Sequence, residues 1–203
     1  TFTNEVDSIA QYLCARSFNI SDNEIQVQGD DGLYLVEDPD AFFSHMKSFG
    51  LLVNDSKSSY SKEECSFLQN YYSLQYIGNN EIVGGIYSTY RALSRIVYPE
   101  RFTKIEDSEI LGRDYFSIRT ISILENCRHH PLFEELVKFV YRLDKYDLAF
   151  SAEGLSEYVR DYSESTGTEG IFNYRYGDDI RGIETFETFK LINKLNSGLV
   201  SEL

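Results

Sequence analysis

A chain of 203 residues with 42% hydrophobic and 15% aromatic residues can bury a core, as one domain or as two small ones, and this composition excludes a disordered protein. The formal net charge of −14 excludes a surface that attracts nucleic acid as a whole, so binding to a polyanion would need local basic stripes or metal ions. No apolar run is long enough to span a membrane, and the three cysteines lack metal-ligand spacing, which favours a reducing compartment.

Residues 3–17 predict an amphipathic helix. Asp7 and Ser8 lie outside its apolar stripe and could face either a cleft or solvent. Four apolar residues recur at helical spacing and are expected to face the core: Val6, Ile9, Ala10 and Leu13.

Residues 25–36 have the pattern of a β-hairpin. Apolar residues alternate on both sides of a Gly-Asp-Asp-Gly connection, at Ile25 and Val27 before it and at Leu33 and Leu35 after it. The glycines at 29 and 32 would allow the chain to reverse and would leave Asp30 and Asp31 side by side at the tip.

Two adjacent carboxylates repel each other unless a cation or a proton lies between them, and Mg²⁺ prefers oxygen ligands. The tripeptide alone is weak evidence, because Gly and Asp are common turn residues and a second copy occurs at residues 177–179. The second copy lacks strand alternation on both sides and predicts a turn that begins a helix.

Residues 38–76 predict an α+β arrangement. Asp38-Pro39 would begin a helix that runs to Phe49 and ends at Gly50, before a short buried strand at residues 51–53. Residues 65–72 predict a second short hairpin. The order helix, hairpin, helix, strand, hairpin is typical of an α+β layer with a mainly antiparallel sheet.

From about residue 78 the pattern is mainly helical. A helix ending near Pro99 carries Arg91 and Arg95 on one side, in the most basic stretch of the chain. Two cations on one helix side could bind a polyanion, and a solvated helix face explains the pattern at least as well. The apolar stripe of this helix is expected at Ile86, Tyr90, Leu93 and Val97, and further helices are expected around residues 107–126, 132–146, 153–163 and 184–195.

Four segments resemble, in order, the later sequence motifs of viral RNA-directed RNA polymerases. The segments are Thr3-x3-Asp7-Ser8 (the end of motif B), Gly29-Asp30-Asp31 (motif C), the helix ending at Gly50 with residues 51–54 and Lys57 (motif D), and residues 65–69 (motif E). Residues 87–102 resemble the thumb helix of double-stranded RNA viruses of the picobirnavirus and partitivirus lineage, with the picobirnaviruses nearest.

The resemblance implies an α+β fold that is the C-terminal part of a right-hand polymerase. Residues 1–76 would be the palm portion, an antiparallel sheet with helices, and residues 77–203 a mainly helical thumb. Motif A, which carries its own metal-binding aspartate, the basic motif F and the fingers are expected upstream in the same polymerase chain or polyprotein. Asp7 stands where the family pattern has Asn, and this leaves the hydrogen bonding to the ribose 2′-hydroxyl open.

The resemblance also implies template-directed nucleotidyl transfer by two divalent ions, Mg²⁺ or Mn²⁺, held in part by Asp30 and Asp31. Lys57 would be a general acid that protonates pyrophosphate. The partners would be an RNA template and primer and nucleoside triphosphates, with no membrane, in the viral particle or the host cytoplasm. The contacts implied are Thr3, Asp7 and Ser8 with nucleotide and template, Phe67 and Leu68 with the primer end, and Arg91 and Arg95 with the RNA backbone.

Two alternatives stay open. The chain could be a non-catalytic acidic α+β interaction module in which Gly29-Asp30-Asp31 is only a turn. It could also be a reverse-transcriptase-like palm, although such palms usually carry an aromatic residue two positions before the paired aspartates, where this chain has Gln28-Gly29. Under the polymerase interpretation, the isolated chain is expected to be inactive.

Overall fold

The computed structural model describes residues 2–54, 56–77, 83–99, 110–167, 172, 174–176 and 179–201. The chain divides into two compact units, Thr1–Gly84 and Gly85–Leu203, and each is described by itself. Among the described residues, none of the helices combines the length and the apolar character needed to cross a membrane.

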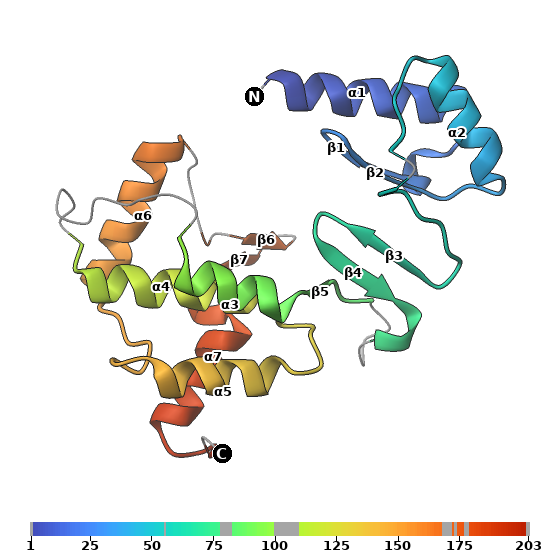
Figure 1. Cartoon of the computed structure of the whole chain (residues 1–203). Helices are drawn as coiled ribbons and strands as arrows, with labels where there is room; N and C mark the ends of the chain where they lie inside the picture. Colours follow the sequence, from blue (N-terminus) through green and yellow to red (C-terminus); the bar gives the residue numbers. More distant parts are fainter. Residues whose placement is uncertain are drawn as a thin grey trace. The chain divides into compact units, whose positions relative to one another are not determined.

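The first unit combines two helices with two antiparallel hairpins (Figure 1). Helices α1 and α2 pack on the first hairpin through a shared apolar core. The elements are α1 (Phe2–Ser17), the single-turn helix η1 (Asp22–Glu24), strands β1 (Ile25–Gln28) and β2 (Asp31–Tyr34), α2 (Pro39–Ser48), strands β3 (Glu64–Phe67) and β4 (Asn70–Ser73), and η2 (Leu74–Tyr76).

Helix α2 begins and ends where its sequence signals predict. The Asp38 side chain accepts a hydrogen bond from the Ala41 N–H at 3.0 Å, Pro39 occupies the first turn, and Gly50 takes a φ of 83° just after the helix. The predicted strand at residues 51–53 is wrong. This segment is irregular, with Leu52 99% exposed, because Leu51 and Val53 pack against the core without a neighbouring strand to pair with.

The predicted core-facing stripe of α1 is also wrong. Val6, Ile9 and Leu13 are exposed by 45%, 57% and 56%. The helix instead buries Gln11, Cys14 and Ala15, and it packs on the hairpin. Short side chains on that face let the helix approach the strands closely, and this close approach explains why the more polar face is buried.

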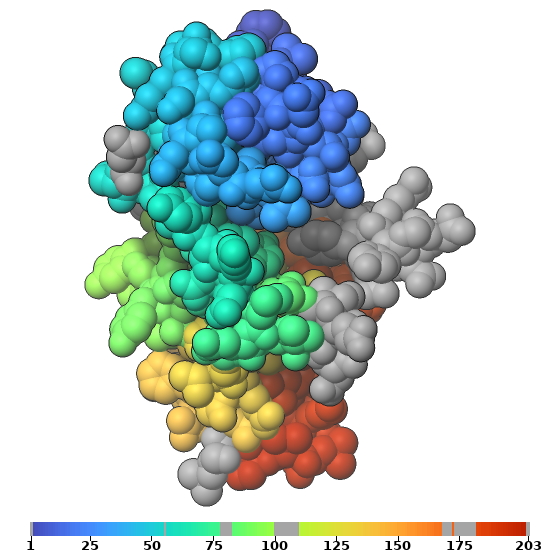
Figure 2. All heavy atoms as spheres, turned by 90° about the vertical axis from the view of Figure 1, so that its right-hand side faces the viewer, coloured from blue at the N-terminus to red at the C-terminus, as the bar shows by residue number. Residues whose placement is uncertain are grey.

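The C-terminal end of α1 and the residue after it contact α2. The rings of Phe18 and Phe42 lie 5.3 Å apart, and the Ser17 hydroxyl lies 2.7 Å from the imidazole of His45. The atoms of residues 2–48, dark blue to cyan in Figure 2, form one continuous surface of this unit. Phe42 is 1% exposed and is the largest fully buried side chain of the unit.

The second unit is mainly helical, as the sequence predicts (Figure 1). Within the described part of this unit, helix α4 lies at the centre and contacts α3, α5, α6 and α7. Its Ile118, Ile121 and Leu124 are completely buried. The elements are β5 (Ile86–Tyr87), α3 (Thr89–Val97), α4 (Gly112–Glu125), α5 (Phe133–Leu143), α6 (Ala152–Thr166), strands β6 (Tyr174–Tyr176) and β7 (Asp179–Arg181), η4 (Ile183–Thr185) and α7 (Glu187–Asn196).

Two details of the second unit differ from the sequence predictions. Leu93 of α3 packs against the core as predicted, but Tyr90 and Val97 are 86% and 63% exposed, because Ala92 and Ile96 face the core in their place. The second Gly-Asp-Asp does not begin a helix. Its residues 177 and 178 lie outside the described part of the chain, but the antiparallel strands β6 and β7 flank them.

Candidate active site

The first Gly-Asp-Asp lies at the reversal of the β1–β2 hairpin. Gln28 pairs with Asp31, so the connecting turn consists of Gly29 and Asp30, and Gly29 takes a φ of 62°. Asp31 is therefore the first residue of β2 rather than part of the turn. The prediction that Gly32 also reverses the chain is wrong, because Gly32 pairs with Val27 inside the strand.

The buried face of β2 differs from the predicted one. Tyr34 and Val36 pack against the core, whereas Leu35 is 69% exposed. Gly32 lies on the same face as Tyr34, and a Cβ atom at residue 32 would overlap the Tyr34 ring. Gly32 thus makes room for an aromatic side chain, and the register places the predicted apolar positions on the outside.

The side chains of Asp30 and Asp31 are exposed at consecutive positions of the hairpin. Two exposed carboxylates can supply oxygen ligands to a divalent cation. Within the described part of the chain, no group of three or more His, Cys, Asp or Glu side chains could hold a metal ion. The donor set therefore fits a divalent cation as a partial site, which needs further ligands from outside these residues.

Helix α1 holds the turn through the backbone of Gly29. The Gly29 N–H donates to the Ser8 hydroxyl at 2.7 Å, and the Gln11 amide nitrogen donates to the Gly29 carbonyl at 2.5 Å. The Gln11 carbonyl oxygen in turn accepts from the Tyr34 hydroxyl at 2.6 Å. A Cβ atom at residue 29 would overlap the Asn4 side chain, so both the positive φ and the close approach of α1 require glycine.

Comparison with known proteins relates the chain to a group of viral polymerases. A scan of protein-family models found no match. The chain is 31% identical over 158 residues to a potential RNA-dependent RNA polymerase of a human picobirnavirus, a match that covers 76% of this chain and 29% of that protein. The chain is a relative of the picobirnavirus RNA-dependent RNA polymerases.

Solved structures of picobirnavirus polymerases have the same fold. The crystal structure of a human picobirnavirus RNA-dependent RNA polymerase matches 95% of this chain and 37% of its own, with 26% identity and a TM-score of 0.66. The crystal structure of an insertion-loop deletion mutant of a human picobirnavirus polymerase matches 97% of this chain and 36% of the mutant chain, with 24% identity and a TM-score of 0.64. The chain thus spans about a third of these polymerases, and the predicted resemblance and the mixed fold with small antiparallel sheets are confirmed.

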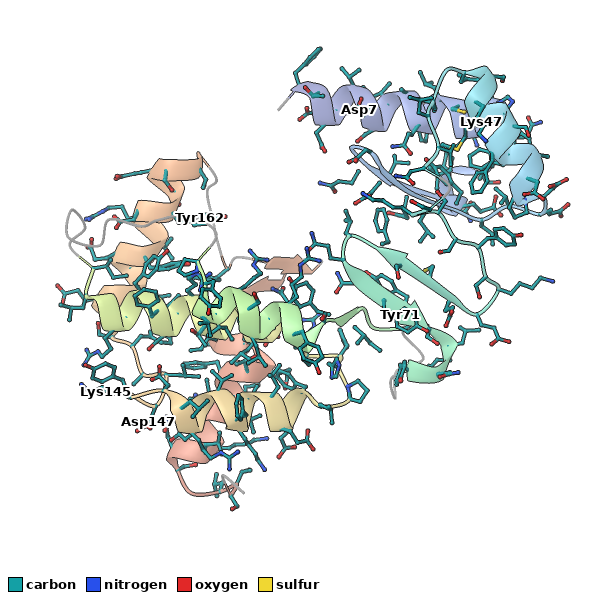
Figure 3. The ribbon with its side chains drawn as sticks, in the orientation of Figure 1. Asp7, Lys47, Tyr71, Lys145, Asp147 and Tyr162 are labelled. Atoms are coloured by element: carbon teal, nitrogen blue, oxygen red, sulfur yellow. The ribbon has the colours of Figure 1, made fainter. Side chains whose placement is uncertain are left out.

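In this chain, the predicted nucleotide-contacting residues of α1 differ in exposure. Thr3 and Asp7 are exposed, and Figure 3 shows Asp7 on the N-terminal half of α1. Ser8 is half-buried, and its hydroxyl both accepts from Gly29 and donates to the Asn4 carbonyl at 2.7 Å. Its hydroxyl is therefore engaged with the Gly-Asp-Asp turn.

The sequence patterns used above did not indicate Gln11 and Tyr34 as site residues. Gln11 is only 8% exposed although glutamine usually lies at the surface. A signal was present in the sequence, because Ser8, Gln11 and Ala15 recur at the i, i+3, i+7 spacing of a second helix face.

Lys57 of this chain lies in an exposed turn. Its backbone N–H donates to the Asn54 carbonyl at 3.0 Å, which closes the turn. Its assignment as a general acid stays a prediction.

The second hairpin, at the segment resembling motif E, has an unusual turn. Leu68 and Gln69 connect β3 to β4, and they take φ values of 47° and 66° although neither is glycine. The Asn70 amide donates to the Leu68 carbonyl at 3.1 Å, which holds the turn. Phe67 is half-buried at the end of β3 and Leu68 is 41% exposed in the turn, so of the two predicted primer-end residues Leu68 occupies the strained reversal.

We expect the double substitution of Leu68→Asn and Gln69→Gly to raise the free energy of unfolding by about 1 kcal/mol, because Asn-Gly adopts this type of turn without strain. Urea unfolding of the chain followed by circular dichroism measures the change. The single change Gln69→Gly should give about half of it. A lower stability of the double variant would show that the Leu68 side chain contributes more packing than the turn costs.

The two arginines of the predicted RNA-binding stretch differ in exposure. Arg91 is exposed near the start of α3, where Ser88 caps the helix. Arg95 is half-buried, with a guanidinium nitrogen 3.5 Å from the Tyr87 hydroxyl. Arg91 is thus the more accessible cation of the pair, and contact of either with RNA stays a prediction.

Proposed function

We propose that this chain is the C-terminal palm and thumb part of an RNA-directed RNA polymerase, with residues 1–76 in the palm and residues 77–203 in the thumb. The observation that carries the proposal is the exposed pair Asp30 and Asp31, on a hairpin anchored to α1, in a relative of the picobirnavirus polymerases. The division into compact units at residues 84 and 85 supports a palm–thumb boundary nearby.

The proposed reaction is template-directed nucleotidyl transfer, in which the 3′-hydroxyl of the RNA attacks the α-phosphate of a nucleoside triphosphate and pyrophosphate leaves. Asp30 and Asp31 are the ligands of this chain for Mg²⁺ or Mn²⁺, and motif A in the full-length polymerase provides the rest. When bound, two such ions activate the attacking oxygen and stabilise the leaving one. The chain's own part is to hold both carboxylates in place before the substrates arrive.

The other predicted residues keep their roles within this proposal. Lys57 donates a proton to the leaving pyrophosphate. Exposed Thr3 and Asp7 contact the nucleotide and template, and Ser8 lies between them and the Gly-Asp-Asp turn. Phe67 and Leu68 contact the primer end. Arg91 and Arg95 contact RNA phosphates.

The exposed apolar side of α1 supports a larger parent enzyme. Phe2 is 85% exposed, and Val6, Ile9 and Leu13 are about half exposed on the same helix. Apolar side chains gathered on one helix side are usually covered by other protein. The chain spans 29% of its curated relative, and we propose that the fingers and motif A of the full-length polymerase cover this side. Replication in the viral particle or the host cytoplasm follows from this proposal.

A primer-extension assay on an RNA template tests the proposal. The full-length polymerase containing this chain should extend the primer only with Mg²⁺ or Mn²⁺ present, and the 203-residue chain alone should give no product. Synthesis by the chain alone would contradict its assignment as an incomplete part. Failure of the full-length protein to synthesise RNA would favour the acidic interaction module, and synthesis of DNA would favour a reverse-transcriptase-like palm.

A further inference from the structure

We propose that Ser8, Gln11 and Tyr34 form a clamp that fixes the direction of the Asp30 carboxylate, so that they are positioning residues for catalysis. The inference rests on the proposed polymerase function and deepens it, because it assigns a role to residues that do not touch the substrate. It also changes the part expected of Ser8, from a nucleotide contact to a contact with the Gly-Asp-Asp turn.

The clamp acts on the two peptide planes that flank Gly29. The N–H of Gly29 belongs to the plane before its Cα atom and its carbonyl belongs to the plane after it. Ser8 holds the first plane and Gln11 holds the second, at 2.7 and 2.5 Å. Because φ and ψ of Gly29 are the only soft rotations between these planes, both are fixed, and so is the start of Asp30.

Glycine is the residue at which this restraint matters most. Without a Cβ atom, it has the widest choice of backbone angles, and an unrestrained Gly29 would let the Asp30 carboxylate sample many directions. The two hydrogen bonds come from one helix, one turn apart, so a single rigid element sets both angles. A metal ligand that is fixed in advance does not lose this freedom when the cation binds.

Tyr34 fixes the orientation of the Gln11 amide. A glutamine amide can rotate so that its oxygen and nitrogen exchange places, and then the oxygen would face the Gly29 carbonyl. The Tyr34 hydroxyl donates to the Gln11 oxygen at 2.6 Å, which leaves the nitrogen facing Gly29. Burial raises the pKa of Tyr34, so the hydroxyl keeps its proton at neutral pH.

Tyr34 is in turn held by the core. Its ring centroid lies 4.9 Å from that of Phe42, and the ring covers Gly32 where any larger residue would displace it. The hydrogen bonds therefore connect the buried core to the exposed carboxylates through Tyr34, Gln11 and Gly29. Removing any one link should loosen Asp30 without unfolding the hairpin.

The clamp is tested first in the chain itself, by hydrogen exchange of the Gly29 amide measured by nuclear magnetic resonance. The amide should be protected in the wild-type chain, since Ser8 accepts its hydrogen bond. Ser8→Ala should raise the exchange rate at least about 10-fold, and Ser8→Thr should restore protection because threonine keeps the hydroxyl. Exchange of the wild-type amide at the rate of an exposed glycine would overturn the clamp.

The catalytic effect is tested in the full-length polymerase by separating kcat from KM for the nucleoside triphosphate. Ser8→Ala and Gln11→Leu should each lower kcat about 10- to 100-fold, the usual effect of removing a group that orients a metal ligand, with KM unchanged. Both should raise the Mg²⁺ concentration needed for half-maximal rate. Ser8→Thr should recover most of kcat, and Gln26→Leu, on the exposed side of β1, serves as the matched control.

The outcomes separate the inference from the proposed function. Wild-type kcat in both Ser8→Ala and Gln11→Leu, in an enzyme that Asp30→Asn inactivates, would overturn the clamp and leave the polymerase proposal standing. A rise in KM with unchanged kcat in Ser8→Ala would also overturn it, because that result indicates a nucleotide contact. Full turnover by Asp30→Asn would remove Asp30 from the metal site, and with it the catalytic role of the clamp, even where the Gly29 amide is protected. Absence of RNA synthesis by the wild-type full-length protein would overturn the proposed function itself.

Discussion

Replacement of Asp30 by asparagine in the full-length polymerase is expected to lower the rate of RNA synthesis by about 10³-fold or more. Asparagine keeps the size of the side chain but removes the negative charge that a divalent cation needs from its ligand. The fold should stay intact, because residue 30 is an exposed turn position at which asparagine is well tolerated. Asp31→Asn should also reduce the rate strongly.

The measurement is single-turnover primer extension with purified variants, together with thermal unfolding to show that the fold is kept. Asp40→Asn is the matched control, since it makes the same change at an exposed aspartate in the first turn of α2. The control should keep the wild-type rate. Turnover by Asp30→Asn at a rate near that of wild type would remove Asp30 from the metal site.

The second large effect concerns stability and lies in the second unit. Asp114 of α4 is 1% exposed, and its carboxylate joins α4 to the start of α6. It accepts hydrogen bonds from the Ser151 hydroxyl at 2.6 Å, the Ser151 N–H at 3.3 Å and the Arg113 Nε at 3.0 Å. The same Ser151 hydroxyl caps α6 by accepting from the Gly154 N–H at 2.9 Å.

We expect Asp114→Asn to lower the free energy of unfolding by about 2–3 kcal/mol at pH 7, because buried hydrogen bonds to a charged group are lost and an amide N–H₂ is placed against donors. A side chain larger than glycine at residue 154 would overlap the carboxylate, so there is no room for the site to rearrange. Urea unfolding of the chain measures the change.

The loss of stability in Asp114→Asn should become smaller at acidic pH. Burial alone would raise the pKa of Asp114, but the hydrogen bonds from Ser151 and Arg113 outweigh it, and the pKa in the folded chain is lowered. A lowered pKa contributes stability above the ordinary value of about 3.9, and this contribution is lost as the pH falls through the folded-state pKa. The gap between wild type and Asp114→Asn should therefore be constant near neutral pH and narrow below about pH 4.

Asp147→Asn is the matched control for this prediction. Asp147 is an exposed aspartate of the same unit with a φ of 54°, which asparagine also adopts readily. The control should change the free energy of unfolding by less than about 0.5 kcal/mol. A gap for Asp114→Asn that widens as the pH falls would contradict the assignment of a stabilising buried carboxylate.

Local signals in the sequence were sufficient for most of the elements. Asp38-Pro39 and Gly50 mark the two ends of α2 as predicted. A capping side chain and a residue with a positive φ affect only the few residues next to them in the sequence. The first hairpin was found for the same reason, because alternation and an Asp-Gly pair are properties of neighbouring residues. The family resemblance also needed only the order of short segments, and the picobirnavirus relatives confirm the family.

What the tertiary structure decided is which surface each element buries. A periodic pattern gives α1 two possible faces and β2 two possible sides, and contacts with distant segments select between them. The exposed Val6 and Leu35 and the role of Gly32 as space for Tyr34 follow from that selection.

The hydrogen bond from Gln11 to Gly29 joins residues 18 positions apart in the sequence. No local pattern specifies such a bond, because its geometry exists only after the helix has packed on the hairpin. The sequence by itself determined that a Gly-Asp-Asp turn is present and which family it resembles. Only the folded chain determined that helix α1 holds that turn, because hydrogen bonds depend on distance and direction in space.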